Sequence, residues 1–301
     1  MRDRKDRNRI FSLVQESLLR LVLFGIRVTP KAASGLFCGL LGLLLHQLSS
    51  KDRRKIARNN EHILGIPRGS EESRTFQKRV LRHQLASSLE SFKSSFAHDL
   101  IEVSGLEELQ DKIHANMEQG LGLIITTGHM GSWELAAYYC SLATGGKFNA
   151  LAKPSKLNAA TVLLDEYRLR MNTKTLWTNQ KSLMKEMVAI LKNGEALGFV
   201  MDQRPDARKG PTVEFMGQPT SFVVGPAWAS VRNGTPVMGV FCMREGPWKY
   251  RLLSTELLPA KHTETDTGKM TQIMAAEIER VIRLYPEQWV WNYSRWKFRR
   301  D

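Results

Sequence analysis

Cysteine is scarce in this chain of 301 residues. The three cysteines, Cys38, Cys140 and Cys242, lie far apart, and their spacing matches neither a zinc site nor a disulfide-rich small domain. Two of them lie within apolar runs, where cysteine usually serves as a small buried hydrophobic residue. A low and odd count is typical of proteins of a reducing compartment. We therefore expect no metal site, and no motif indicates a cofactor.

A long uncharged apolar run is also missing. Residues 10–28 are mostly apolar but contain Gln15, Glu16 and Arg20. A central charge costs about 3 kcal/mol on insertion scales, which roughly cancels the gain from the apolar side chains. Residues 32–48 carry no charge, yet 17 residues are at the short limit for a spanning helix. Neither segment precedes the small-residue cleavage site of a signal peptide.

Basic residues flank these two apolar segments, at 2–9 and at 51–58. Such a pattern is typical of helices that lie in a membrane interface with their cations on anionic headgroups. We predict that residues 1–50 form a membrane-anchoring or interfacial helical segment and that residues 51–301 form one catalytic domain. The alternative is two amphipathic helices that pack on a soluble core.

Acidic residues are outnumbered, with 30 Asp and Glu against 44 Lys and Arg. The resulting formal charge of +14 and the pI near 9.8 indicate an anionic partner. Nucleic acid, an anionic membrane and an acidic protein all satisfy this condition. Composition alone does not choose among them.

Hydrophobic patterning predicts strands that alternate with helices, which is typical of an α/β layer architecture. No repeat and no Gly-Ser-Pro linker divides the body of the chain. We expect helical structure over residues 70–119, 132–143, 157–171, 181–192 and 270–285. We expect strands over residues 121–127, 148–153, 196–201, 236–243 and 250–257.

The central motif follows the first of these strands and reads Gly-His-Met-Gly-Ser-Trp-Glu from residue 128 to 134. Five helical positions turn the chain by about 500°, so His129 and Glu134 would not share a helix face. We therefore expect His129 on the loop and Glu134 in the first turns of the helix, from where its carboxylate reaches back to the imidazole. A carboxylate on one ring nitrogen fixes the tautomer and leaves the other nitrogen free to accept a proton.

This pair is the base half of a catalytic triad without a serine, so the substrate's own hydroxyl would act as nucleophile. A bare His-x4-Glu is common by chance, and a lone histidine more often has a structural role. The position of His129 after a buried strand and between two glycines favours catalysis, because ligands of α/β sheets bind beyond the carboxyl ends of strands.

The motif resembles the His-x4-Asp/Glu signature of glycerolipid-type acyltransferases, and it is most similar to that of the lipid A biosynthesis lauroyl/myristoyl acyltransferase family. Three further blocks resemble that family and come in its order. They are YRLRMNTK at residues 167–174, MDQR at 201–204 with VEFMG at 213–217, and YPEQWVW at 285–291 with RWK at 295–297. Two positions depart from the family pattern: Ser132 replaces an asparagine, and Arg204 stands where an acidic residue is common.

The resemblance implies a mixed sheet flanked by helices, of the glycerolipid-acyltransferase type. It implies transfer of a fatty acyl chain from an acyl thioester to a hydroxyl of a lipid A precursor. The thioester would be carried by acyl carrier protein, with coenzyme A as the alternative carrier. His129 and Glu134 would be catalytic, and Arg170, Asp202 and Arg204 would bind the substrate. The implied partners are the acyl carrier protein, an anionic glycolipid acceptor and the membrane surface, with no nucleic acid. The implied location is the cytoplasmic face of the bacterial inner membrane.

Two alternatives remain open from the sequence. The first keeps the chemistry and changes the acceptor, as in a phosphatidylinositol-mannoside acyltransferase or another glycolipid or aminolipid acyltransferase. The second belongs to another class, a basic membrane- or nucleic-acid-binding protein with a degenerate site.

Overall fold

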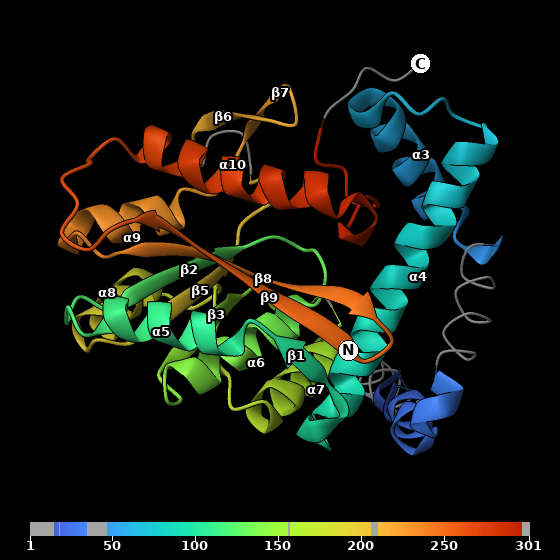
Figure 1. The fold of residues 1–301 in the computed structure, drawn as a ribbon, viewed down its shortest axis with the longest axis horizontal. Helices are drawn as coiled ribbons and strands as arrows, with labels where there is room; N and C mark the ends of the chain where they lie inside the picture. Colours follow the sequence, from blue (N-terminus) through green and yellow to red (C-terminus); the bar gives the residue numbers. More distant parts are fainter. Residues whose placement is uncertain (1–14, 18, 35–46, 156, 206–209, 297–301) are drawn as a thin grey trace, which may run out of the picture.

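The computed structural model describes residues 15–17, 19–34, 47–155, 157–205 and 210–296 (Figure 1). A mixed sheet of seven strands in the order β1-β9-β8-β2-β5-β3-β4 forms the centre of this part of the chain. All neighbours pair in parallel except β8 and β9. The strands are β1 (Glu102–Ser104), β2 (Leu123–Thr127), β3 (Phe148–Ala152), β4 (Lys174–Trp177), β5 (Ala196–Val200), β8 (Val237–Gly246) and β9 (Lys249–Leu258).

Strand β2 lies at the centre of the sheet, between β5 and β8. All five of its residues are buried. Its alternate side chains enter two separate apolar cores: Ile124 packs on one face of the sheet, and Leu123 and Ile125 pack on the other. A parallel strand covered on both faces has no polar side, which explains the continuous apolar run in the sequence.

Helices cover both faces of the sheet (Figure 1). One face carries α5 (Leu106–Met117), α6 (Trp133–Ala143) and α7 (Asn158–Arg170). The other carries α8 (Leu183–Lys192), α9 (Gly225–Asn233) and α10 (Thr267–Leu284). The small antiparallel hairpin of β6 (Thr212–Phe215) and β7 (Gln218–Ser221) contacts α10.

Two further helices stand beside one end of the sheet, at the right in Figure 1. They are α3 (Ser50–Leu64) and the long α4 (Glu71–Ser94), which pack on each other. Helix α4 begins at the N-cap Ser70, whose hydroxyl accepts a hydrogen bond from the backbone N–H of Ser73. Along its length α4 contacts two 3₁₀ turns, η1 (His98–Leu100) and η2 (Pro286–Gln288). The helix therefore forms a wall along the edge where β2 ends.

The five predicted strands and the four predicted helices after residue 120 are confirmed, with ends that differ by a few residues. The single helical stretch predicted for residues 70–119 is wrong, because α4 ends at Ser94 and β1 intervenes before α5. Strand β1 has three residues at the edge of the sheet, too few to give a readable alternation. Gly105 then turns the chain with φ +80° into α5. The hydrophobic pattern also did not predict α3, α9, β4 or the β6–β7 hairpin.

Within the described part of the chain, no helix combines the length and apolarity needed to cross a membrane. Residues 19–28 are helical, and Arg20 pairs there with Glu166 of α7 at 2.7 Å. Most of the predicted segment at 32–48 lies outside the described residues. The membrane-anchoring or interfacial role predicted for residues 1–50 stays a prediction.

Candidate active site

The loop between β2 and α6 carries His129. Gly131 in this loop has φ +55°, and a Cβ there would lie 2.2 Å from the carbonyl oxygen of Cys242, so only glycine fits. Backbone hydrogen bonds fix the loop: the N–H of Ser132 donates to Cys242 O at 2.8 Å, and the N–H of Gly131 donates to Gln288 O at 3.0 Å. The loop is thus held between β8 and η2 and is a rigid support for the imidazole.

The imidazole of His129 is paired with Asp202, which follows β5. His129 Nδ1 lies 2.5 Å from Asp202 Oδ1, and the backbone N–H of His129 donates to Asp202 Oδ2 at 2.8 Å. Trp289 Nε1 donates to the same Oδ2 at 2.7 Å. Asp202 is 3% exposed, so these three donors replace the water that its carboxylate loses.

Electrostatics stabilise the charged forms of both partners. Burial lowers the pKa of His129, but the charge and hydrogen bond of Asp202 raise it more, so that it lies above its ordinary value. Burial likewise raises the pKa of Asp202, but His129 and the hydrogen bond from Trp289 lower it more, so that it lies below its ordinary value. An ionised Asp202 holds the proton of the neutral imidazole on Nδ1. The lone pair is then on Nε2, which lies 3.3 Å from the amide nitrogen of Gln203.

The expected contact between Glu134 and the imidazole is wrong, because Glu134 pairs with Arg168 of α7 instead. Arg168 Nε and Nη2 donate to the two carboxylate oxygens of Glu134 at 2.9 and 2.7 Å. The pair is largely enclosed, with the Arg168 side chain 7% exposed and that of Glu134 17% exposed. Glu134 acts on His129 through its charge alone, as the last of the influences that raise the pKa of His129.

Arg168 was not among the predicted site residues, although it lies two positions before the predicted Arg170. Its helical spacing gives the signal that could have identified it. Leu164, Arg168 and Met171 recur at intervals of four and three, so Arg168 shares the face of α7 that packs on the sheet. An arginine on a buried face needs a carboxylate partner, and Glu134 supplies it. Gln203 and Trp289 lie within two of the blocks that resemble the family, but neither was predicted to be a site residue.

Arg170 lies at the C-terminal end of α7 and packs against the end of α4. Its guanidinium carbon lies 4.5 Å from the centre of the Phe96 ring, and its Nε donates to Ser95 Oγ at 3.3 Å. Arg204 is half-buried, and its carbonyl oxygen accepts a hydrogen bond from Tyr293 Oη at 3.4 Å. Neither arginine has a described contact with His129 or Glu134. Of the five predicted site residues, the structure brings His129 and Asp202 into contact and places Glu134 five positions along the same loop and helix.

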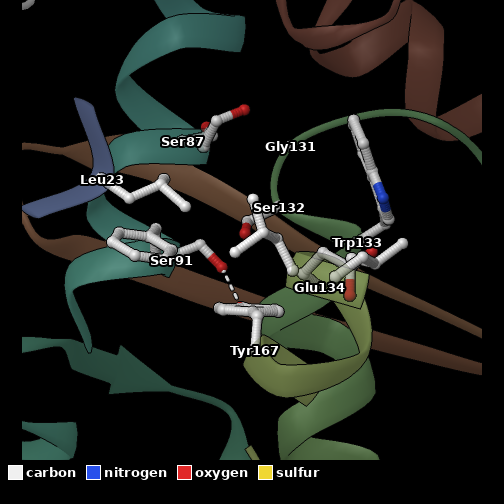
Figure 2. Close-up of a pocket in the computed structure, with 12 residues that line it drawn as sticks. Leu23, Ser87, Ser91, Gly131, Ser132, Trp133, Glu134 and Tyr167 are labelled. Atoms are coloured by element: carbon white, nitrogen blue, oxygen red, sulfur yellow. Dashed lines mark hydrogen bonds between the residues drawn. The ribbon is translucent and has the colours of Figure 1, made fainter. Parts of the chain in front are cut away.

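A cavity of about 220 Å³ opens beside this loop (Figure 2). Its walls come from α4, from the loop and first turn of α6, from α7 and from the helical segment before residue 28. The lining residues are Leu23, Ser87, Ser88, Ser91, Phe92, Gly131, Ser132, Trp133, Glu134, Leu163, Leu164 and Tyr167.

The lining of this cavity is mostly apolar. Several of its polar groups are paired, whereas the buried hydroxyl of Ser87 has no partner among the described residues. Ser91 Oγ lies 2.5 Å from Tyr167 Oη (Figure 2). Glu134 is held by Arg168, which lies outside the lining. The Trp133 ring lies edge-on to the His129 ring with 5.2 Å between their centres, so the cavity wall is next to the imidazole. The arrangement can bind a flexible apolar chain and present its polar end to a base.

Sequence comparisons relate the chain to acyltransferases that act on glycolipids. A family model described as "Bacterial lipid A biosynthesis acyltransferase" matches residues 2–298. Phosphatidylinositol mannoside acyltransferase of Mycobacterium tuberculosis (strain CDC 1551 / Oshkosh) is 26% identical over 190 residues, which are 62% of this chain and 58% of that protein. The protein of the same name from Mycolicibacterium smegmatis (strain ATCC 700084 / mc(2)155) is 24% identical over 225 residues, 72% of each chain.

Lipid A biosynthesis palmitoleoyltransferase of Escherichia coli (strain K12) is also similar. It is 25% identical over 269 residues, which are 83% of this chain and 80% of that protein. The chain thus spans less than two thirds of the M. tuberculosis relative and four fifths of the E. coli one.

Proposed function

Because the chain belongs to the bacterial lipid A biosynthesis acyltransferase family and is therefore an acyltransferase, we propose that it transfers a fatty acyl chain from acyl carrier protein to a hydroxyl of a lipid A precursor. The observation that carries the proposal is the pair of the half-buried His129 and the buried Asp202 beside an apolar cavity. An acyl transfer needs both parts, a base for the hydroxyl and an apolar site for the chain.

In the proposed reaction, His129 Nε2 removes the proton of the acceptor hydroxyl as its oxygen attacks the thioester carbonyl. The new C–O bond forms and the C–S bond breaks, and the imidazolium returns the proton to the departing thiolate. Asp202 stabilises the imidazolium and keeps Nε2 directed toward the acceptor. No step requires an acylated residue, so donor and acceptor would be bound at the same time.

The negative charge on the tetrahedral intermediate needs hydrogen-bond donors. The first turn of α6 lines the cavity with its residues Trp133 and Glu134, and the first N–H groups of a helix have no partner within the helix. We assign the stabilisation of the oxyanion to this helix N-terminus, where the dipole favours negative charge. The Glu134–Arg168 pair fixes α6 to α7 and thereby holds this turn in the cavity wall.

We assign the acyl chain to the cavity of about 220 Å³. Apolar burial favours a fatty chain by about 0.8 kcal/mol for each CH₂ group that leaves water. Trp133 lines the cavity and its ring contacts the ring of His129, so a thioester bound next to Trp133 would lie beside His129.

We also propose that the protein works at the cytoplasmic face of the bacterial inner membrane, with residues 1–50 as an interfacial segment. The helix at residues 19–28 exposes four large apolar side chains, those of Leu21, Val22, Phe24 and Val28. A membrane interface would cover them. The basic run at 51–58 follows and suits anionic headgroups. The excess of positive charge also suits an acidic carrier protein.

A second acceptor has support of its own. The mycobacterial relatives carry the name phosphatidylinositol mannoside acyltransferase, at 24% and 26% identity. We propose a phosphatidylinositol mannoside as the runner-up acceptor. The non-enzymatic alternative is set aside, because the family is one of acyltransferases and the His129–Asp202 pair is intact.

The test of this function is an assay of the purified full-length protein in mixed micelles. Acyl carrier protein charged with a fatty chain is offered together with either a lipid A precursor or a phosphatidylinositol mannoside, and the lipids are analysed by mass spectrometry. We expect a mass increase of one acyl group on the lipid A precursor. Acylation of the mannoside alone would establish the runner-up, and acylation of neither would contradict the proposal.

A further inference from the structure

A second cavity, of about 270 Å³, adjoins the same helix α4 and is lined by charged rather than apolar side chains. Its walls are formed by Arg79, Arg82 and His83 of α4, by Arg244 of β8 and by Glu287 of η2. None of these residues lines the apolar cavity. We call this second space the basic cavity.

The floor of the basic cavity is built rigidly around Arg244. The guanidinium of Arg244 donates to both carboxylate oxygens of Glu90 at 2.9 and 2.7 Å. Its backbone N–H and C=O are both bound by the side-chain amide of Gln288, at 2.9 and 2.8 Å. Arg244 is 14% exposed and Glu90 4%, so the arginine is held in place before any ligand arrives. A guanidinium fixed in this way loses little conformational freedom on binding.

The basic cavity is coupled to the catalytic loop through two short connections. The carbonyl oxygen of Gln288, whose side chain holds Arg244, accepts the N–H of Gly131. The carbonyl oxygen of Cys242, two residues before Arg244 on β8, accepts the N–H of Ser132. The basic cavity and the loop of His129 are therefore built on the same backbone.

Positive groups outnumber negative ones around the basic cavity. Glu287 is the acidic residue of its lining, and it accepts from Arg79 Nη1 at 2.7 Å and lies 3.8 Å from His83 Nε2. Arg82 is exposed and forms no ion pair with any residue in the described ranges. Burial lowers the pKa of His83, and the positive charges of Arg244 and Arg82 lower it further, as expected where cations gather.

A solvated arginine cluster is the simpler explanation of such a surface. It does not explain why Arg244 is nearly enclosed and held by four hydrogen bonds, or why Arg82 lines a cavity that already contains two arginines. Arg244 is paired with Glu90 and Arg79 with Glu287, so Arg82 supplies the excess positive charge, which an anion in the cavity would neutralise. Guanidinium groups match phosphate oxygens in pairs, which makes a phosphate ester the anion of choice.

We propose that the basic cavity is a phosphate-ester subsite that binds one of the two substrates while its acyl or hydroxyl group lies at His129. The inference rests on the proposed function. The phosphate can belong to the headgroup of the acceptor lipid or to the phosphodiester of the donor's carrier arm. In both cases a phosphate ester lies near the group that reacts at His129. Helix α4 would then contact both parts of the substrates. Its residues 87–92 would bind the apolar chain, and its residues 79–83 would bind the phosphate.

The test compares two double variants of the full-length protein. Arg79→Gln with Arg82→Gln removes two positive charges from the basic cavity. Arg74→Gln with Lys78→Gln removes two positive charges from exposed positions of the same helix that line neither cavity. The two variants share helix, exposure and net charge, so any difference between them belongs to the basic cavity.

Four substrates distinguish the source of the phosphate. The donors are acyl-4′-phosphopantetheine and acyl-pantetheine, and the acceptors are the glycolipid with and without its phosphate. In the cavity variant we expect kcat/KM for one phosphorylated substrate to fall about 10- to 100-fold, while its kcat changes little. The kcat/KM for the phosphate-free counterpart of that substrate should also change little. The affected pair identifies donor or acceptor. Equal kinetics of the cavity variant and the control variant on all four substrates would overturn the proposal.

A direct binding measurement separates this inference from the proposed function. Binding of inorganic phosphate to the full-length protein can be measured by calorimetry. The wild type and the control variant should bind phosphate, and the cavity variant should bind it at least about 10-fold more weakly. If the wild type binds phosphate in this way but transfers no acyl chain, the proposed function fails and the phosphate site stands. If the wild type and the cavity variant bind phosphate equally, or neither binds it, the subsite is refuted whatever the transfer assay gives.

Discussion

Two carboxylates lie near the candidate base, and the structure gives them different partners. Asp202 is 3% exposed and accepts hydrogen bonds from the imidazole and backbone of His129 and from the indole of Trp289. Glu134 has a 17% exposed side chain and is held by the guanidinium of Arg168. Glu134 is the closer of the two along the sequence, five residues from His129 rather than 73. The spacing of the His-x4-Glu motif therefore identifies its two residues, but it does not predict which residues they contact.

The largest effect is expected from replacing His129, the candidate base, which Asp202 contacts and Glu134 does not. His129→Ala should lower kcat by at least about 10²–10⁴-fold, because it removes the general base and leaves the cavity intact. Rates of acyl transfer from acyl carrier protein check this, with thermal unfolding as a control for the fold. Near-normal transfer by a folded His129→Ala protein would contradict the mechanism.

Asp202→Asn should be the next most damaging change. The amide replaces an acceptor-only group by one that donates, which favours the wrong imidazole tautomer and removes the stabilisation of the imidazolium. We expect a loss of about 10²–10⁴-fold in kcat. Trp289→Phe is the matched control, because it removes one donor to the same carboxylate without touching the imidazole. A Trp289→Phe protein that is as impaired as Asp202→Asn would show that the carboxylate's role is structural.

Glu134→Gln should reduce activity less than Asp202→Asn and reduce stability more. The change breaks a bidentate pair and leaves the charge of Arg168 uncompensated in a largely enclosed place, at a cost of about 1–3 kcal/mol. Denaturant unfolding gives the stability and initial rates give the activity. Should Glu134→Gln abolish transfer at unchanged stability while Asp202→Asn is tolerated, the roles assigned to the two carboxylates would have to be exchanged.

The pH profile sharpens the same comparison. The base acts as the neutral imidazole, so kcat/KM should fall as the pH drops through the pKa of His129. Burial lowers this pKa, but Asp202 raises it more, so the fall should be centred above the ordinary value of about 6.5. Asp202→Asn should move the midpoint to lower pH, and Glu134→Gln should move it less in the same direction. A midpoint that is insensitive to Asp202→Asn would mean that another group titrates.

The smallest effect is expected at Arg170, which the sequence resemblance made a substrate-binding residue. Its guanidinium packs on the rings of Phe92 and Phe96 and donates to Ser95. Arg170→Gln should change kcat/KM by no more than about 3-fold, the scale of a half-exposed cation–π contact. Arg168→Gln is the comparison and should resemble Glu134→Gln. A large loss at Arg170 with little loss at Arg168 would restore the sequence-based assignment.

The parts of the site that lie close together in the chain could be predicted. The apolar run before residue 128 predicts a buried strand, and the two glycines predict the loop that presents His129, as the structure has it. Asp202 lies in the MDQR block and directly follows another predicted strand, at 196–201. Its contact with His129 depends on β2 and β5 being neighbours in register, with Thr127 opposite Val200, so that both residues emerge at the same edge. That pairing is a long-range property, and the local pattern of either strand carries no record of it.

The two arginines of α7 show the same limit within a single sequence block. Arg168 and Arg170 both lie in the YRLR block, and only the burial of one face of the helix separates them. Strand β1 and the β6–β7 hairpin were missed because strands of three or four residues are too short for a periodic signal.

The contacts of the two carboxylates predict that Asp202, and not Glu134, sets the protonation of the His129 imidazole. Nitrogen-15 NMR of His129 in the wild type and in the Asp202→Asn and Glu134→Gln variants tests it most directly. We predict that the neutral wild-type ring carries its proton on Nδ1, that Asp202→Asn shifts this tautomer and lowers the pKa of His129, and that Glu134→Gln leaves the tautomer in place. A proton on Nε2 in the wild type, or a tautomer that changes with Glu134→Gln and not with Asp202→Asn, would contradict the account.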